Sequence, residues 1–227
     1  MRGEESGYCR PVLRTLIAIL GVAMSIYAQQ PTHVLFVHRD FLKPGSDTAY
    51  RQIEDDGARI CADMGCPHPY VGMESLAGPK EAWWLNGFGS QPEMNQIAAD
   101  YQKNTRLMAA LAEITQRKQG LIGEPVEVVL TYQPKLSRGA PWSVGRGRFL
   151  VVLETKSPPQ AEGTVFEGPD GTRWVFVSAQ TLSEAKAKAA ALGAEAKIFA
   201  VRPNWSMPAR DWVAADPTFW KSRPAPR

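Results

Sequence analysis

Apolar and polar residues along the chain follow two periods, one typical of β-strands and one typical of α-helices. Short apolar runs bounded by glycine, proline and polar residues predict strands at 33–39, 70–76, 81–88, 126–132, 148–155, 164–167, 172–177 and 197–202. Apolar residues that recur at every third or fourth position predict helices at 47–64, 90–119 and 182–192. The first half of the chain therefore has the order β-α-β-β-α-β, the split βαβ arrangement of ferredoxin-like folds.

One strand-to-helix sequence occurs twice. Residues 81–94 (EAWWLNGFGSQPEM) align without a gap with residues 172–185 (TRWVFVSAQTLSEA), so that Trp83 matches Trp174. In both copies a hydroxyl residue follows the strand and a glutamate comes three positions later. This pattern is a capping box, which fixes where the next helix begins. Two copies of one unit predict a duplicated domain.

The second copy is shorter than the first. Ser157-Pro158-Pro159 follows its first strand at the place where the first copy has a helix, and a hairpin around 168–171 comes next. We therefore expect an α+β fold of two fused ferredoxin-like halves with antiparallel sheets, of which the second lacks its first helix. The expected segments are a signal peptide at 1–28, a first half at 29–133, a Pro- and Gly-rich linker at 134–147, a degenerate second half at 148–202 and a Trp- and Pro-rich C-terminal strap at 203–227.

The N-terminal residues are typical of an export signal. Arg2, Arg10 and Arg14 precede an uncharged stretch at 15–28, and Ala28 offers a cleavage site. As a helix this stretch would span roughly 21 Å, which is less than the membrane core of roughly 30 Å. We expect cleavage after Ala28 and a periplasmic or extracellular protein without membrane contact; the alternative is an uncleaved anchor.

Export bears on the cysteines. Cys9 would leave with the signal, and Cys61 and Cys66 would remain as an even pair. In an oxidising compartment such a pair predicts a disulfide, and the C-x4-C spacing differs from the C-x-x-C of redox enzymes. The alternatives are two unpaired structural thiols, or a metal site that would add His68 but has no apparent fourth ligand nearby.

Charge and motifs exclude several classes of function. The net charge is +3, and the lysines and arginines are scattered, which argues against nucleic acid or an anionic membrane surface as the main partner. The chain also lacks the G-x-S-x-G, H-E-x-x-H and G-x-x-x-x-G-K-[ST] motifs of hydrolases, metalloproteases and nucleotide-binding proteins. The sequence leaves open whether the protein is a monomer or a homodimer.

Two short stretches resemble the dimeric α/β barrel superfamily, which includes antibiotic-biosynthesis-type monooxygenases and NIPSNAP-like proteins. They are the opening strand with Lys43-Pro44-Gly45, and the strand and turn Trp83-Trp84…Phe88-Gly89-Ser90. In that superfamily two ferredoxin-like sheets face each other, usually from two subunits. The resemblance covers residues 32–202 and implies a pseudo-dimeric α/β barrel whose two sheets come from one chain.

Polar and aromatic residues within apolar strands are the candidates for a cavity between two facing sheets. Asn86 shares a strand face with Trp84 and Phe88, and His38 lies in the opening strand. We take His38, Trp84, Asn86 and Phe88 as candidate ligand-binding residues; the alternative is ordinary hydrogen bonding at strand ends or edges. No catalytic residue is identified. The acidic run 54–56 is expected to be a solvated helix face.

The resemblance also bears on cofactors. The haem-degrading branch of the superfamily has a tryptophan on its third strand, for which Trp83 or Trp84 would serve, and binds haem iron through a histidine on its second helix. His68 is the last histidine of this chain, so the second helix has none. We therefore expect no haem bound in the manner of that branch; the alternative is a haem with a different iron ligand. We also expect no other cofactor and no bound metal.

These observations favour an exported protein that binds a small apolar or aromatic ligand in an aromatic-lined cavity. One alternative is a cofactor-independent monooxygenase of the same superfamily, in which His38 and Asn86 position an oxidisable substrate and Trp84 packs against it. A second alternative is a structural module that docks on another protein through the tryptophan-rich tail at 203–227.

Overall fold

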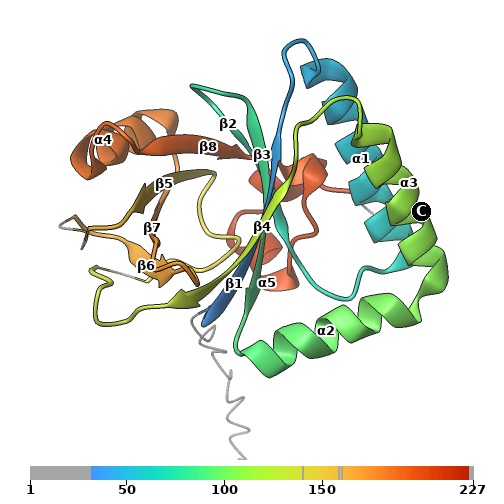
Figure 1. Cartoon of the computed structure of the whole chain (residues 1–227), viewed down its shortest axis with the longest axis horizontal. Coiled ribbons are helices and arrows are strands. Elements are labelled where there is room, and N and C mark those ends of the chain that lie inside the picture. The colour runs from blue at the N-terminus through green and yellow to red at the C-terminus, as the bar shows by residue number, and fades with distance from the viewer. Residues whose placement is uncertain (1–31, 140, 158, 160, 225–227) are drawn as a thin grey trace, which may run out of the picture.

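A closed antiparallel barrel forms the body of the protein (Figure 1). The computed structural model describes residues 32–139, 141–157, 159 and 161–224, so the predicted signal peptide lies outside the described residues. The strands are β1 (Val34–Phe41), β2 (Val71–Ser75), β3 (Glu81–Phe88), β4 (Val126–Tyr132), β5 (Phe149–Thr155), β6 (Thr164–Glu167), β7 (Arg173–Ala179) and β8 (Lys197–Val201). The α-helices are α1 (Asp47–Met64), α2 (Gln91–Lys103), α3 (Thr105–Lys118), α4 (Leu182–Leu192) and α5 (Arg210–Ala215).

The barrel consists of two ferredoxin-like halves with the same strand order. The first half has the strand order β4-β1-β3-β2. The second half has the order β8-β5-β7-β6, in which the fourth, first, third and second strands of that half again follow one another. Antiparallel pairing of β2 with β8 and of β4 with β6 joins the halves and closes the barrel. Between β5 and β6 the described residues contain no helix. The predicted fold class, including the missing helix of the second half, is confirmed.

The two matched tryptophans meet inside the barrel. The indole rings of Trp83 on β3 and Trp174 on β7 lie 5.5 Å apart between centroids, and both side chains are buried. Equivalent positions of the two copies thus face each other across one shared core. Each half covers the apolar face of the other, which is why a chain with two small sheets can exclude water from both.

The helix that follows each of these strands begins with the same hydrogen bonds. Ser90 accepts a bond from the N–H of Glu93 at 3.3 Å, and Thr181 accepts one from the N–H of Glu184 at 3.1 Å. Each glutamate carboxylate accepts from the N–H of the residue before the cap, at 2.7 Å in the first copy and 2.8 Å in the second. The predicted capping boxes therefore form with one shift: the carboxylate bonds one residue earlier than in the standard motif.

Side chains fill the interior of the barrel. At one end Arg39 bonds Glu81 at 2.9 Å and Glu154 at 3.1 Å, and its guanidinium lies 4.4 Å from the Trp83 ring. At the other end, Trp212 and Trp220 from the C-terminal segment join the core. The apolar residues that form this core include Leu35, Val37, Leu85, Leu130, Trp142, Leu150, Phe166, Phe176 and Phe199.

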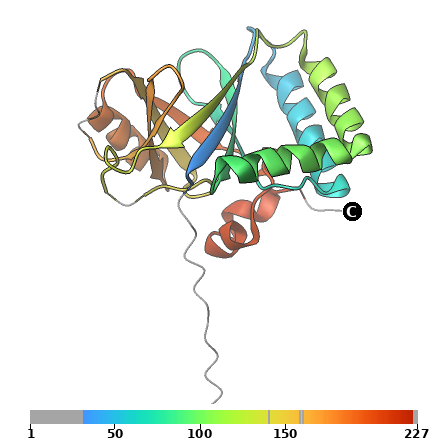
Figure 2. The ribbon, with the colours of Figure 1, turned by 60° about the horizontal axis from the view of Figure 1, so that its bottom comes forward.

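The C-terminal segment from Pro203 onward runs back over the first half of the chain. Trp205 packs on the outside of the barrel against Tyr50 and Trp84, with ring centroids 6.1 and 6.5 Å away. Helix α5 then lies below the barrel in the view of Figure 2. Because the three tryptophans of this segment, Trp205, Trp212 and Trp220, are all buried, the segment contributes to the core.

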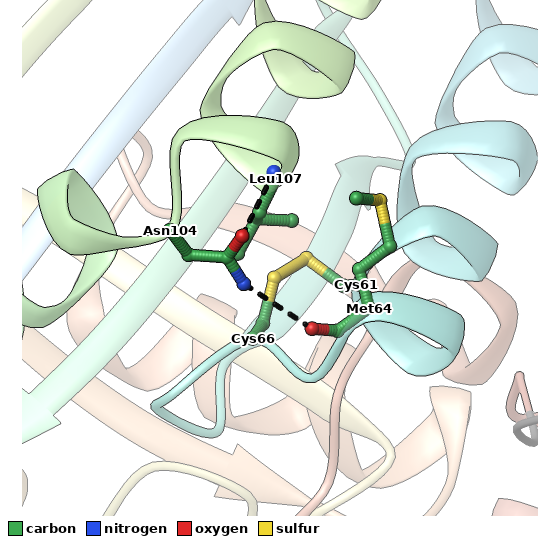
Figure 3. The surroundings of a disulfide bond; sticks show 5 residues. All are labelled: Cys61, Met64, Cys66, Asn104 and Leu107. Carbon is green, nitrogen blue, oxygen red and sulfur yellow. Dashed lines mark hydrogen bonds between the residues drawn. A yellow bond between two sulfur atoms is a disulfide. The ribbon is translucent and has the colours of Figure 1, made fainter.

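The sequence predicted one long helix after Ser90, and the structure contains two. The chain turns at Asn104, whose side chain accepts a bond from the N–H of Leu107 at 3.1 Å and so caps α3 (Figure 3). The same side chain donates to the carbonyl of Met64 at 3.5 Å, at the end of α1. The prediction of a single helix is wrong because apolar residues keep the helical period on both sides of the turn.

The predicted disulfide between Cys61 and Cys66 is confirmed, and it joins the last turn of α1 to the loop that follows. Replacing both cysteines by serine is expected to lower the free energy of unfolding by about 2 kcal/mol, since a bridge over a short loop removes little entropy from the unfolded chain. Urea denaturation measures this. A reducing agent should lower the stability of the wild type to that of the variant and leave the variant unchanged. Equal stability of the oxidised wild type and the variant would contradict the prediction.

Candidate functional site

A cavity of about 450 Å³ lies between the outer face of the first sheet and helices α1, α2 and α3. All four candidate residues, His38, Trp84, Asn86 and Phe88, line it. The prediction that these residues line a cavity between two facing sheets is wrong, since the space between the sheets is the filled interior of the barrel. That the four residues bind a ligand stays a prediction.

Strand alternation explains this placement. Successive side chains of a strand point to opposite faces of the sheet. On β3, Trp83 and Leu85 belong to the barrel core, whereas Trp84 and Asn86 line the cavity. One face of β3 therefore contributes to the barrel core, and its other face contributes to the cavity.

The helices form the apolar walls. Ala58 and Cys61 come from α1, and Leu111 and Ile114 from α3, whose neighbouring turns lie across the cavity from the sheet. Helix α2 has no buried residue and covers one end, running from the end of β3 to the start of α3 (Figure 1). Its inward face supplies Met94, Ile97, Ala98 and Tyr101. The cavity is therefore mostly apolar.

A buried carboxylate organises the opposite, polar end. Asp40 is 0% exposed and accepts three hydrogen bonds. Tyr50 donates its hydroxyl at 2.7 Å and Lys118 its ammonium at 2.9 Å, both to Oδ2, and Nε2 of His38 lies 2.9 Å from Oδ1. Burial alone would raise the pKa of Asp40, but the bond from His38 and the charge of Lys118 outweigh it and lower the pKa to about 2. Asp40 is therefore ionised at neutral pH.

His38 is held between two carboxylates. Its Nε2 faces Asp40, and its Nδ1 lies 3.0 Å from Oε1 of Glu127 on the neighbouring strand. Burial alone would lower the pKa of His38, but the hydrogen bonds and charge of these partners outweigh it and raise the pKa above 6.5. The protonated ring donates to both carboxylates. Its ring edge also contacts Trp84, with centroids 5.5 Å apart.

Glu54 and Lys118 bring an ion pair to the cavity wall. Nζ of Lys118 lies 3.1 Å from Oε1 of Glu54 and 4.8 Å from the centroid of the Trp84 ring. Burial raises the pKa of Glu54, although the charge of Lys118 opposes it. Burial alone would lower the pKa of Lys118, but the charges of Glu54 and Asp40 raise it. The end of the cavity is thus a coupled set of acids and bases.

Three polar side chains of the cavity have no hydrogen-bond partner among the described residues. They are the amide of Asn86 and the hydroxyls of Tyr70 and Tyr101. Burial raises the pKa of Tyr70 and raises that of Tyr101 to about 12, so both hydroxyls stay neutral. All three groups are available to a bound molecule.

Sequence reasoning missed Asp40, Tyr50, Glu54 and Lys118. The acidic run at 54–56 was expected to be solvated, but Glu54 is only 6% exposed. Its position gives the signal that could have identified it: Glu54 precedes Gly57 and Ala58 by three and four residues, on the apolar face of α1. Lys118 similarly follows Ile114 by four residues on α3.

The described residues include no cluster of three or more His, Cys, Asp or Glu side chains that could hold a metal ion. None of the helices in the described part of the chain has the length and apolar content to cross a membrane.

Comparison with known proteins gives a weak likeness of fold. No protein-family model matches the chain, and no curated protein sequence matches it. A crystal structure described as a "putative monooxygenase" from Fusobacterium nucleatum is similar, with a TM-score of 0.47 and 10% identity, over 78% of this chain and 94% of that one. Another so described, from Lactobacillus acidophilus, has a TM-score of 0.40 and 8% identity, over 75% of this chain and 93% of that one. Similarity at this level carries no information about activity.

Proposed function

We propose that this chain is a small-molecule-binding protein whose cavity takes a small apolar or aromatic ligand. The observation that carries the proposal is the cavity of about 450 Å³, built from one sheet face and three helices and lined mainly by aromatic and aliphatic side chains. Binding of an apolar ligand to such a cavity is favourable, because it removes apolar surface of both the protein and the ligand from water. The few polar groups of the cavity would orient that ligand.

An enzyme is the second candidate, and one observation favours it. His38, Asp40, Glu54 and Lys118 form a connected set of titratable groups at the wall of an apolar cavity, the kind of environment that shifts pKa values at catalytic sites. Both ring nitrogens of His38 already face carboxylates, so His38 is poorly placed to take a proton from a substrate. Oxygen consumption with an oxidisable aromatic substrate would identify a monooxygenase.

Other features of the proposal stay predictions. They are export through residues 1–28, the absence of nucleic acid and membrane partners, the state of monomer or homodimer, and docking of another protein on the C-terminal segment.

A cavity-filling variant tests the binding site. Ala98 lines the cavity from α2, whereas its neighbour Ala99, which is equally exposed to solvent, does not. Ala98→Trp is expected to place an indole in the cavity and weaken the binding of 2-methylnaphthalene, measured by equilibrium dialysis, roughly tenfold or more, which corresponds to about 1.4 kcal/mol. Ala99→Trp is the matched control and should bind like the wild type. Equal binding by both variants would place the ligand elsewhere, and no binding by the wild type would count against the proposal itself.

A further inference from the structure

Among the ionisable groups that form the polar end of the cavity, one carboxyl group has hydrogen-bonding capacity left over. Asp40 is fully buried and already accepts bonds from Tyr50, Lys118 and His38. His38 in turn uses both ring nitrogens, for Asp40 and Glu127. Asp40 does not line the cavity, and His38 cannot bind a ligand through a ring nitrogen without giving up an existing partner.

Glu54 is different. Glu54 lines the cavity, and within the described residues its Oε1 has no hydrogen bond of good geometry. Nζ of Lys118 lies 3.1 Å from this oxygen as an ion pair, and the Glu54 side chain is only 7% exposed. The Tyr50 hydroxyl also lies near Glu54, but it already donates its proton to Asp40. Buried carboxyl groups in native proteins nearly always accept hydrogen bonds, and one that lacks them costs stability. A ligand in the cavity can supply the missing donor.

The charges around Glu54 indicate what kind of donor fits. Acidic and basic groups alternate here: Asp40 and Glu54 both pair with Lys118, and Asp40 and Glu127 flank His38. Because each basic group already lies between two carboxyl groups, the set offers neither an anion nor a cation an unpaired partner. A ligand ammonium group would be repelled by Lys118, and a ligand carboxylate would be repelled by Glu54. An uncharged donor meets neither cost.

We infer that the ligand is an uncharged molecule with an apolar body and a hydroxyl group that donates a hydrogen bond to Glu54. This inference rests on the proposed function. The apolar body lies against Trp84 and the helices α2 and α3, and the hydroxyl reaches the end of the cavity where α1 places Glu54 beside Lys118. Glu54 is then the residue that selects hydroxylated ligands over hydrocarbons of the same shape, because a cavity built to accept a hydrogen bond discriminates against an analogue without the donor.

Two probes of nearly equal shape test the inference. 2-Naphthol carries a hydroxyl group where 2-methylnaphthalene carries a methyl group, and equilibrium dialysis at neutral pH gives the ratio of their dissociation constants. The ratio of dissociation constants removes the contribution of the naphthalene ring, which both probes share. Comparing this ratio between protein variants also removes the effect of the probes' different solubilities in water. In Glu54→Leu the preference for 2-naphthol is expected to fall roughly tenfold or more relative to the wild type, because the hydrogen bond to the Glu54 carboxyl group is lost.

Two further variants complete the experiment. Glu54→Gln keeps a neutral acceptor and should lose part of the preference. Asp56→Asn lies on the same helix but outside the cavity, where Asp56 pairs with Arg59 and Arg117, and it should keep the preference of the wild type. If Glu54→Leu does not fold, an unchanged preference in Glu54→Gln is enough to overturn the inference.

The failures of the two proposals are distinguishable. In one outcome, both probes bind the wild type, both bind more weakly to Ala98→Trp, and the preference for 2-naphthol is the same in all Glu54 variants. The cavity then binds ligands, but Glu54 does not select them. If neither probe binds the wild type, the proposed function fails and the inference with it.

Discussion

Replacing Asp40 by alanine is expected to lower the free energy of unfolding by about 3–5 kcal/mol, the range found when one partner of a buried ion pair is removed. The buried carboxylate of Asp40 accepts hydrogen bonds from Lys118, Tyr50 and His38. Without it, the buried Lys118 ammonium keeps only Glu54 as a counter-ion. The Tyr50 hydroxyl, on a fully buried side chain, loses its partner.

The effect of Asp40 also depends on pH, and the direction follows from its pKa. Folding lowers the pKa of Asp40 from 3.8 to about 2. The ionised form is favoured in the folded protein, so this contribution to stability is fully present above about pH 4 and is lost as the pH falls toward 2. The difference corresponds to about 2.5 kcal/mol. The wild type should therefore lose stability over this range more steeply than Asp40→Ala.

Chemical denaturation at pH 7 and at several values between pH 2 and 4 measures both effects. Glu127→Ala is the matched control, since Glu127 bonds the same histidine but has a side chain 62% exposed to solvent. Exposed pairs contribute about 0–1 kcal/mol, so this variant should stay near the wild type. If the two variants lose equal stability, Asp40 does not organise the polar end in the way described.

The architecture was predictable because it depends on local patterns. Strand alternation, helical periodicity and the repeated strand and cap are properties of short stretches, and they suffice to show two ferredoxin-like halves. The turn at Asn104 was not predictable in this way, because it depends on the Met64 carbonyl, which is distant in sequence. Nothing in the apolar period distinguishes a helix that continues through Asn104 from one that restarts there.

The candidate site was predicted in part for the same reason. His38, Trp84 and Asn86 could be identified as unusual residues within strands, but the pattern alone does not say which face of a strand turns toward the other sheet. Closure of the barrel decides that, through pairing of β2 with β8 and of β4 with β6. Glu54 and Lys118 look like surface charges in sequence, and become part of the site only because α1 and α3 pack side by side on the sheet.

Two adjacent tryptophans provide the sharpest test that the first sheet has a core face and a cavity face. Trp83→Ala is expected to lower the free energy of unfolding by about 3–5 kcal/mol, as for other large core residues replaced by alanine. The Trp83 ring is fully buried, lies 4.4 Å from the Phe199 ring between centroids, and donates from Nε1 to Glu81 at 2.8 Å. Its removal leaves a hole in the barrel and a buried carboxylate with one donor fewer.

Trp84→Ala is the matched variant one residue along the strand. Trp84 is half-buried at the cavity wall, so its removal is expected to cost about 1–2 kcal/mol, from lost apolar burial and the lost contact with Lys118. Ligand binding should respond in the opposite order: Trp84→Ala should weaken the binding of 2-naphthol, and Trp83→Ala, measured where it is still folded, should leave it nearly unchanged. Thermal unfolding and equilibrium dialysis give the two readouts. If the two variants change stability equally and also change the binding of 2-naphthol equally, the ligand does not occupy the outer face of β3. A ligand on that face would contact Trp84 and not Trp83, so only Trp84→Ala would weaken its binding.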